Sequence, residues 1–404
     1  MVKADVYFFS ATALKSKDSL SKVKGPLSLE YLGFNKEVKK NDRVCIKTHF
    51  GALENTRYLR PTYMRFLCDY VKEFGASPSV AESCGWGLPG AGGEYGGRAS
   101  EKEYLGVALK HGFTKETMGA PILMLDGPIG IDYESQKING KWFNEVLVAG
   151  RLREFDLLIS AAHFKGHSGT GFGGALKNIG IGCVSKGGKV QAHTGKNLTR
   201  NFEKCVSECT DCIDICPTNS LRKDTNNKII YNKDTCKNCY MCVSACNEEV
   251  FKREKIAREQ FIEQMIDNAL GVVEFFNQEK IFYINYAIDI THQCDCSGGS
   301  DVNFVQDVGI LASRDPVAVD MACVDLTHKS PALPNSCLDG LEIPEKNGIH
   351  EWFSYIPRFN YENNETDLNR NAEYQDFWKI QLNAAEKLGL GTKKYNLIEI
   401  TEFE

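Results

Sequence analysis

Two runs of cysteines dominate the middle of the chain: CVSECTDCIDICP at residues 205–217 and CKNCYMCVSAC at residues 236–246. Together they hold eight of the sixteen cysteines in the sequence. The spacings are Cys-x3-Cys-x2-Cys-x3-Cys-Pro in the first run and Cys-x2-Cys-x2-Cys-x3-Cys in the second. Loops this short let several thiolates converge on one metal centre, so both runs are predicted to bind metal.

Cubane iron–sulfur clusters fit these spacings best, because four thiolates close together can ligate several irons. In two-cluster ferredoxins the fourth cysteine of each run binds the cluster of the other run. We therefore predict two 4Fe–4S clusters with exchanged fourth ligands. The first is assigned to Cys205, Cys209, Cys212 and Cys246, and the second to Cys236, Cys239, Cys242 and Cys216.

Other uses of the cysteines fit the pattern less well. Zinc motifs usually pair one Cys-x2-Cys with a distant second pair of ligands, whereas here two runs of four follow one another. Disulfides would require an export signal, which we do not find in the sequence. Two details depart from the iron–sulfur pattern, since the first gap is x3 rather than x2 and Asn247 stands where a second proline would be expected. Neither change removes a ligand.

The composition is that of an ordinary globular protein, with 42% hydrophobic and 25% charged residues. A length of 404 residues predicts two structural units. The net charge of −5 gives no sign of a nucleic-acid partner, and no apolar run approaches the ~18 residues of a membrane span. So many cysteines without an export signal indicate a reducing compartment. We therefore expect a cytoplasmic protein of an anaerobe.

Predicted strands alternate with predicted helices, a pattern that indicates an α/β fold with an open, largely parallel sheet. Strands are expected near residues 6–9, 43–50, 78–83, 121–126, 155–162, 280–289, 308–312 and 395–400, and helices near 101–111, 259–276, 316–326, 372–388 and from 61 onward. The 121–126 run is so apolar that we expect burial on both faces. Because strands flank the cysteine runs, a bacterial-type ferredoxin module (α+β) at 201–252 is expected to be inserted between α/β parts at 1–200 and 253–404.

Polar side chains follow four of the predicted strands, at the carboxyl ends where an open α/β sheet binds ligands. A single histidine in such a place is more often structural than catalytic, but four polar strand ends favour one shared crevice. Imidazoles titrate near neutral pH and can supply protons, so His163 or His167 is expected to do so. The candidate catalytic residues are His49, His163, Lys165 and His167.

A glycine-rich segment, Gly169-Thr-Gly-Phe-Gly-Gly174, precedes the helix-like Ala175-Leu-Lys-Asn178. Its backbone amides could cradle a phosphate or carboxylate, with a lysine adding charge; a flexible turn is the alternative. The segment matches neither the dinucleotide fingerprint nor a Walker loop. The candidate cofactor-binding residues are Lys47, Gly171, Gly173, Gly174, Lys177 and Asn178.

Cys294 and Cys296 follow a predicted strand and are separated by one residue. We expect two free thiols here, because the short ring of a disulfide would be strained and the compartment is reducing. Residues i and i+2 of a strand point the same way, so both sulfurs could face one ligand. The pair is therefore either packed small residues or a reactive-thiol or metal site that includes Cys183.

The chain resembles the iron–sulfur proteins of the domain of unknown function 362 family from about Lys47 to Asp325. The motifs that carry the resemblance are His49, His163-Phe-Lys-Gly-His167, Gly171-Phe-Gly-Gly-Ala-Leu-Lys-Asn178, Gly182-Cys183, Gln191-Ala-His193, the two cysteine runs, Cys294-Asp-Cys296 and Gly309-Ile-Leu-Ala-Ser-Arg-Asp-Pro-Val-Ala-Val-Asp320. The resemblance implies two 4Fe–4S clusters on an α/β domain. It implies no particular reaction.

These features predict an iron–sulfur oxidoreductase that passes electrons to an anionic substrate or cofactor in the crevice. The length of the chain favours this over a simple electron carrier or partner-docking protein, since a carrier needs no large domain. The third hypothesis is a protein that delivers metal or clusters, suggested by the cysteines outside the two runs. Most of those cysteines fit ordinary core positions better than a delivery role. We expect a redox partner protein and no nucleic-acid or membrane partner, and the sequence leaves open a small anionic ligand and an additional anionic or flavin cofactor.

Overall fold

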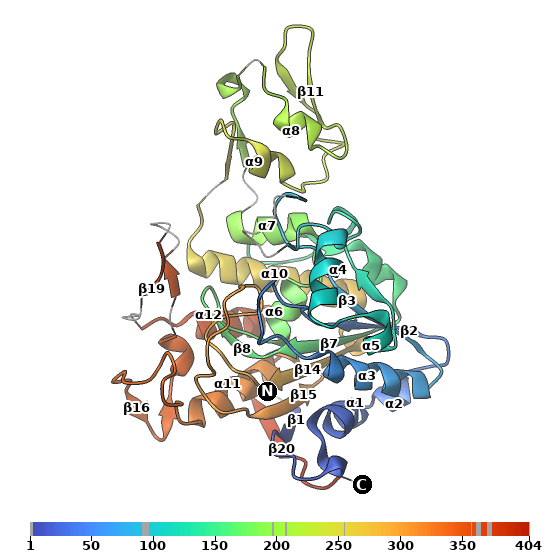
Figure 1. The fold of residues 1–404 in the computed structure, drawn as a ribbon, viewed down its shortest axis with the longest axis vertical. Helices are drawn as coiled ribbons and strands as arrows, with labels where there is room; N and C mark the ends of the chain where they lie inside the picture. The colour runs from blue at the N-terminus through green and yellow to red at the C-terminus, as the bar shows by residue number, and fades with distance from the viewer. Residues whose placement is uncertain are drawn as a thin grey trace.

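The computed structural model describes residues 3–90, 97–195, 198–206, 208–253, 255–356, 358–360, 365–369 and 374–403. An eight-stranded sheet forms the centre of the molecule (Figure 1). Its strands, in spatial order, are β20 (Tyr395–Glu399), β1 (Ala4–Ser10), β15 (Gly309–Ser313), β14 (Ile281–Ala287), β7 (Leu157–His163), β2 (Arg43–Lys47), β3 (Ser77–Glu82) and β4 (Ile122–Met124). Every neighbouring pair is parallel except the two pairs that β15 makes, with β14 and with β1. The predicted α/β class and largely parallel sheet are confirmed.

Helices cover both faces of the sheet, and each face buries its own apolar core. One core packs against α6 (Ala175–Gly180), α10 (Arg258–Phe276), α11 (Pro316–Lys329) and α12 (Phe377–Lys387). The other packs against α1 (Gly25–Tyr31), α2 (Phe34–Glu37), α3 (Pro61–Glu73), α4 (Glu101–Lys110) and α5 (Lys115–Met118). This three-layer arrangement is the one that alternating strands and helices predict. Among the helices of the described residues, none is long and apolar enough to cross a membrane.

Local sequence accounts for most of these elements. Pro61 occupies the first turn of α3, where its missing N–H costs nothing. Asp315 caps α11 by accepting hydrogen bonds from the backbone N–H groups of Val317 and Ala318, both at 2.8 Å. The predicted burial of the 121–126 strand on both faces is wrong, since Ile122 and Leu123 are only partly buried. Its strand, β4, lies at the edge of the sheet, where apolar composition alone cannot distinguish it from a central strand.

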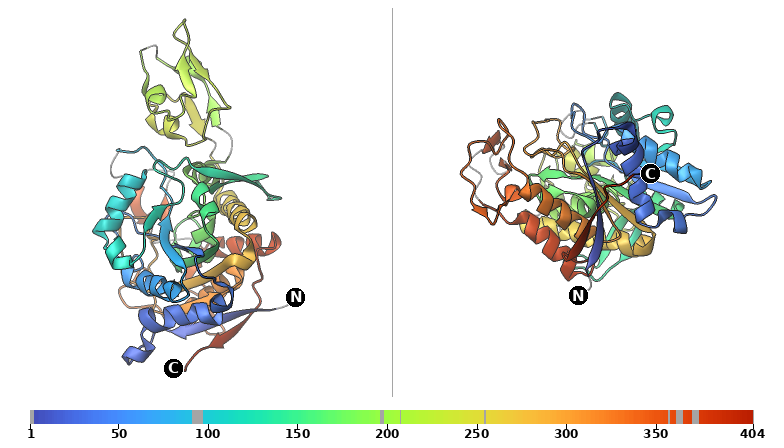
Figure 2. Two further views of the ribbon diagram at one scale, coloured as in Figure 1. Left: turned by 90° about the vertical axis from the view of Figure 1, so that its right-hand side faces the viewer. Right: turned by 90° about the horizontal axis from the view of Figure 1, so that it is seen from below.

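Residues 198–253 form a separate unit that we call the cysteine module. It contains β10 (Leu198–Arg200), α8 (Asp211–Asp214), β11 (Leu221–Lys223), β12 (Ile229–Tyr231), α9 (Met241–Ala245) and β13 (Phe251–Arg253). Two antiparallel pairs, β10–β13 and β11–β12, enclose a small apolar core of its own. Figures 1 and 2 show the module projecting from one end of the α/β domain. In sequence it lies between β7 and β14, which pair directly in the sheet.

The remaining elements extend the main body at its periphery. α7 (Lys186–Thr194) lies between the sheet domain and the cysteine module (Figure 1). The other short elements are the strand pairs β5 (Tyr133–Lys137) with β6 (Glu145–Ala149), β8 (Lys165–His167) with β9 (Gly171–Gly173), β16 (Glu345–Lys346) with β17 (Ile349–His350), and β18 (Arg358–Asn360) with β19 (Glu365–Asn369).

Deleting residues 201–252 with a short Gly-Ser linker is expected to leave a folded α/β domain. The pairing of Leu198 with Arg253 holds the two ends of the module side by side, so a short linker can join them. Circular dichroism and thermal unfolding of the shortened chain test this, and iron analysis compares its iron content with that of the full-length protein. If the circular dichroism spectrum shows that the shortened chain is unfolded, the two units do not fold independently.

Candidate functional site

The parallel strands β2, β3, β4, β7 and β14 bring their carboxyl ends to one edge of the sheet. Charged groups gather there, and we call them the strand-end cluster. Its members are Lys47, His49, Glu82, Arg98, Lys165, Lys177 and Asp295. Of the predicted site residues, His49 and Lys177 are each close enough to Lys165 to feel its charge. Four cations face two anions, which makes this edge attractive to a negatively charged ligand.

Lys47 and Glu82 form the floor of the cluster. The side chain of Lys47 is fully buried, and its Nζ lies 3.0 Å from Glu82 Oε1 and 3.0 Å from Asn178 Oδ1. Asn178 in turn donates to the carbonyl of Lys47 at 3.2 Å and to Ser160 Oγ at 2.9 Å. A buried charge needs such partners. Lys47 and Asn178, both predicted to bind a cofactor, therefore hydrogen-bond to each other instead. Their contact joins α6 to β2.

Asp295, in the loop after β14, contacts His163 at the end of β7 and Lys165 at the start of β8. Its carboxylate accepts from His163 Nδ1 at 2.8 Å and from Lys165 Nζ at 3.1 Å. Burial would raise the pKa of Asp295, but the charges of His163 and Lys165 outweigh burial and hold this pKa far below its usual value. His163 Nε2 also lies 2.8 Å from the carbonyl of Ile288. Both nitrogens of the His163 ring are thus engaged within the protein.

His49 and Arg98 form the other side of the cluster. His49 Nδ1 accepts from the amide of Gly51 at 2.9 Å, and its Nε2 lies 3.2 Å from Arg98 Nη1. Arg98 also donates to the carbonyl of Cys296 at 2.9 Å. Burial and the Arg98 charge lower the pKa of His49 well below its usual value. His49 is therefore a neutral ring at neutral pH.

Lys177 is the member of the cluster whose protonation changes near neutral pH. Burial lowers its pKa to about 7, with the charge of Lys165 acting in the same direction and that of Asp295 against it. Its ammonium forms no hydrogen bond or ion pair with any residue that the structure describes. The expectation that His167 titrates near neutrality is wrong, since burial and the Lys177 charge lower the pKa of that ring well below its usual value. Lys177 is therefore a better candidate than His167 for donating a proton near neutral pH.

The glycine-rich segment is packed against neighbouring chain segments. Asp320 accepts hydrogen bonds from the amides of Ala175 at 2.7 Å and Leu176 at 3.0 Å, so these amides of α6 are not available to an external anion. A Cβ at Gly174 would lie 2.3 Å from Asp320 Oδ1, and one at Gly171 would lie 2.7 Å from the backbone nitrogen of Trp378. Gly171 also has a positive φ of 80°, which favours glycine. Of the predicted glycines, Gly173 alone faces the cluster, since its Cβ would lie 3.8 Å from Lys165 Nζ.

His167 lies beside Cys294 and Cys296, with its ring nitrogen and both sulfurs all within 4.8 Å of one another. The expectation of two free thiols is contradicted, because the structure joins the sulfurs in a disulfide. The loop brings their Cα atoms to 5.3 Å, a separation that a disulfide accommodates. Cys183 is not part of this group. It is buried near Lys47, and burial raises the pKa of its thiol to about 12.

The eight cysteines of the module fall into two groups of four. We call Cys205, Cys209, Cys212 and Cys246 the outer quartet, and Cys216, Cys236, Cys239 and Cys242 the inner quartet. Burial raises the pKa of Cys212 to about 11, and the three other members of the outer quartet add to this rise. Burial also raises the pKa of Cys239, on which the charges of Cys236 and Cys216 act as well. Each group therefore takes its fourth cysteine from the other run.

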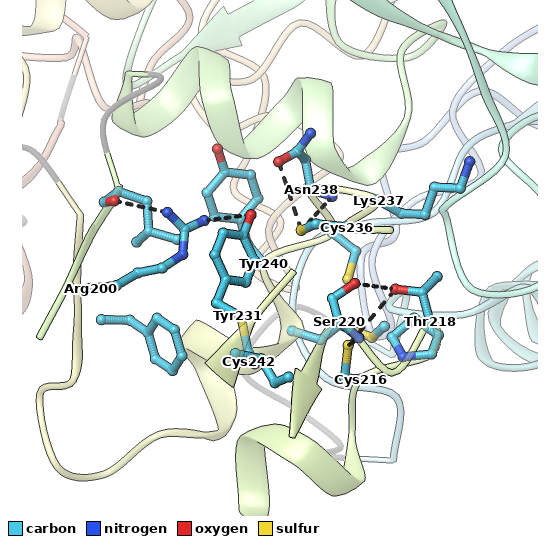
Figure 3. Close-up of a pocket in the computed structure, with 16 residues that line it drawn as sticks. Arg200, Cys216, Thr218, Ser220, Tyr231, Cys236, Lys237, Asn238, Tyr240 and Cys242 are labelled. Carbon is cyan, nitrogen blue, oxygen red and sulfur yellow. Dashed lines mark hydrogen bonds between the residues drawn. The ribbon is translucent and has the colours of Figure 1, made fainter. Parts of the chain in front are cut away.

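The inner quartet lines one pocket of about 490 Å³, a volume that includes its open mouth (Figure 3). The amide of Ser220 donates to Cys216 Sγ at 3.2 Å, and the amide of Asn238 donates to Cys236 Sγ at 3.4 Å. Burial would raise the pKa of Cys216, but such backbone hydrogen bonds outweigh it and lower this pKa. Four thiols around a pocket with amide donors to sulfur suit an anionic metal–thiolate group.

The inner quartet adjoins the α/β domain through α7. A Cβ at Gly187 would lie 2.5 Å from the carbonyl of Asn238, and the Lys186 charge acts on the Cys239 thiol. Further along α7, Lys189 Nζ donates to Ser83 Oγ and, at 2.7 Å, to the carbonyl of Cys84. These two residues directly follow β3 and Glu82. One helix thus connects the inner quartet with the strand-end cluster.

Sequence reasoning missed several residues of this site. Two of them could have been found from the sequence. Asp295 stands between two cysteines after a predicted strand, and Glu82 is the last residue of β3, at the end of the strand where ligands bind. Asp320 is flanked by Val319 on a helix face that is otherwise apolar, which marks a buried acid with a specific partner. Arg98 carries no such signal, because the fold alone brings it to His49.

Comparison with known proteins identifies the family. The model of the family described as "Domain of unknown function (DUF362)" matches residues 44–325. The chain is a member of the DUF362 family. This DUF362 protein shows no significant similarity to any curated protein.

Among solved structures, the lactate racemase apoprotein from Thermoanaerobacterium thermosaccharolyticum resembles this DUF362 protein, with 12% identity and a TM-score of 0.39. The likeness covers 82% of this chain and 60% of that one. The chain thus spans less than two thirds of the length of that protein. A likeness this distant does not extend to function.

Proposed function

We propose that this DUF362 protein is an iron–sulfur oxidoreductase that binds an anionic substrate or cofactor at the strand-end cluster. The outer and inner quartets would each hold one 4Fe–4S cluster. Such clusters would supply single electrons. The observation that carries the proposal is the position of the inner quartet, which α7 connects to a cationic group of residues at the sheet edge.

The thiols fit the clusters in number, grouping and environment. The two quartets draw on both runs, as exchanged fourth ligands require. Backbone amides donate to Cys216 and Cys236, and such hydrogen bonds stabilise the negative charge of a cluster. Zinc fits less well, because zinc motifs usually pair one Cys-x2-Cys with a distant second pair of ligands, whereas here two runs of four follow one another.

The strand-end cluster would bind and protonate the ligand. Arg98 and Lys165 are fixed by their hydrogen bonds, so they offer preorganised positive charge without having to rearrange. Lys177 has no fixed partner among the described residues and a pKa of about 7. It can therefore give a proton to a ligand that gains negative charge, as a general acid needs. Lys47, paired with Glu82, binds Asn178 and so positions α6, the helix that carries Lys177.

The alternatives are an electron carrier, a partner-docking protein, or a protein that delivers metal or clusters. The four cations at the sheet edge, with Lys177 unpaired among the described residues, favour a ligand-binding enzyme over these alternatives. A sharp test is electron density or mass spectrometry of anaerobically purified protein. A bound organic anion near Lys165 and Lys177 would support the enzyme hypothesis. A strand-end cluster with no bound ligand and no measurable affinity for anions would support an electron carrier.

Anion binding is expected to weaken as pH rises through about 7. Lys177 carries its charge below its pKa and loses it above, so sulfate, which does not titrate in this range, should bind about tenfold more weakly at pH 8.5 than at pH 6. Calorimetric titration between these pH values measures the effect. Lys177→Met should bind weakly throughout, whereas Lys110→Met, at an exposed end of α4, should behave as the parent. A pH-independent affinity in the parent would contradict this role of Lys177.

A further inference from the structure

The loop after β14 presents two sulfurs and one imidazole at a single place. The ring nitrogen of His167 and the sulfurs of Cys294 and Cys296 all lie within 4.8 Å of one another. Donors around a tetrahedral ion with bonds of about 2.0–2.3 Å lie about 3.3–3.8 Å apart. Small side-chain rotations would thus bring all three donors onto one ion. We propose that the reduced form of this pair, together with His167, binds a single thiophilic divalent metal ion.

The backbone of the loop is fixed, as a metal site requires. The amide of Ala52 donates to the carbonyl of Asp295 at 2.7 Å, and Arg98 donates to that of Cys296 at 2.9 Å. The Asp295 carboxylate points at His163 and Lys165. The residue between the cysteines is thereby anchored, and the two sulfurs on either side of it are left for a common ligand.

His167 is held from its other side. Its Nδ1 lies 3.0 Å from Thr170 Oγ1 and 3.1 Å from the amide of Gly169, and Thr170 Oγ1 donates to the carbonyl of Phe172 at 2.6 Å. A histidine that binds metal usually donates its second ring N–H to a fixed acceptor, and Thr170 Oγ1, whose own hydrogen is used on Phe172, can accept from Nδ1–H. In the metal-bound form the amide of Gly169 would therefore give up its hydrogen bond to Nδ1. With Nδ1 engaged, Nε2 is the nitrogen left for an ion.

The disulfide must open before metal can bind. An external dithiol reduces it by two electrons and two protons: its own sulfurs become a disulfide and the two cysteines become thiols. Binding a divalent ion then releases the two thiol protons, because thiolates are the ligands. Two sulfurs and one imidazole suit zinc or another thiophilic ion, and three protein ligands leave one coordination position open.

The open position gives the ion a role at the proposed site, and in this respect the inference rests on the proposed function. Lys177 and Lys165 both act electrostatically on His167, so the strand-end cluster adjoins the three ligands. An anion held by these lysines could complete the coordination of the ion. The metal site itself does not depend on the iron–sulfur clusters, so the two ideas can fail separately.

Zinc binding by the full-length, anaerobically purified protein tests the proposal. After treatment with a dithiol and desalting, the parent is expected to take up one zinc per chain beyond its starting content, measured by equilibrium dialysis and elemental analysis. X-ray absorption at the zinc edge should show two sulfur ligands with lighter atoms completing the shell. Untreated protein, with its disulfide intact, should take up none at this site.

Variants identify the ligands. Cys294→Ser/Cys296→Ser should lose the added zinc, and His167→Ala should bind it at least tenfold more weakly. Cys45→Ser/Cys68→Ser removes two buried thiols elsewhere and should bind as the parent does. Cys216→Ser, which lowers iron content if the clusters exist, should still bind zinc here. No uptake by the reduced parent, unchanged uptake in Cys294→Ser/Cys296→Ser, or a four-sulfur spectrum would overturn the proposal.

Discussion

Cys216→Ser is expected to lower the iron and acid-labile sulfide of anaerobically prepared protein from about eight of each per chain to about four. Cys216 belongs to the first run in sequence but to the inner quartet in space. Its loss should therefore destabilise the cluster of the second run. Cys246→Ser should have the same effect on the outer quartet. Iron and sulfide analysis, with electron paramagnetic resonance of the reduced protein, measures both.

Double variants test the exchange of ligands directly. Cys216→Ser/Cys236→Ser removes two ligands of the inner quartet and should lose about as much iron as Cys216→Ser alone. Cys216→Ser/Cys205→Ser removes one ligand from each quartet and should lose nearly all of it. The opposite ranking would show that each run binds its own cluster. Cys68→Ser, at a buried cysteine of α3, should keep the iron of the parent. Zinc in place of iron in the parent would end the iron–sulfur interpretation.

Asp320→Ala is expected to lower the free energy of unfolding by about 3–5 kcal/mol. The carboxylate is fully buried and accepts from the amides of Ala175 and Leu176 and, at 2.7 Å, from Asn285 Nδ2. Alanine would leave the two α6 amides without a partner and Asn285 Nδ2 with only its contact to Cys323 Sγ at 3.5 Å, and each unsatisfied buried group costs about 1–3 kcal/mol. Burying the Asp320 carboxylate is itself costly and raises its pKa to about 6. The net loss in the free energy of unfolding is therefore smaller than the summed cost of the unsatisfied donors.

Chemical denaturation of purified variants measures this effect. Asp325→Ala is the matched control, because Asp325 lies on the same helix and accepts one hydrogen bond, from Tyr395 at 2.6 Å, at a less buried position. It should cost about 1 kcal/mol. Asp320→Ala should also weaken sulfate binding, because the first turn of α6 precedes Lys177. Equal destabilisation by the two variants would mean that the cap of α6 contributes little.

The features that could be predicted from the sequence are those set by neighbouring residues. The mostly apolar run at 155–162 predicts an interior strand, and β7 is buried along its full length. The cysteine spacings predict two groups of four, because the ligands of one cluster come from short loops. Asp315 with Pro316 predicts the start of α11, since capping involves only the next few residues.

The features that could not be predicted depend on distant segments. The reversed direction of β15 between β14 and β1 follows from the order in which strands pair, to which its own sequence gives no clue. The capping of α6 joins residues 145 positions apart. The pKa of Lys177 follows from burial that only the folded chain produces. The glycine-rich segment looked like an anion cradle because the sequence does not show that Asp320 is already bound to α6.

The proposed exchange of the fourth cysteine between the two clusters has a consequence for biosynthesis. Because the outer quartet needs Cys246, it cannot form while the ribosome has made only the first run. The inner quartet needs Cys216 from that first run, so it too spans both runs. If the quartets hold clusters as proposed, neither cluster can be completed on the first run alone. The metal would then be installed after both runs have left the ribosome, or on the released protein.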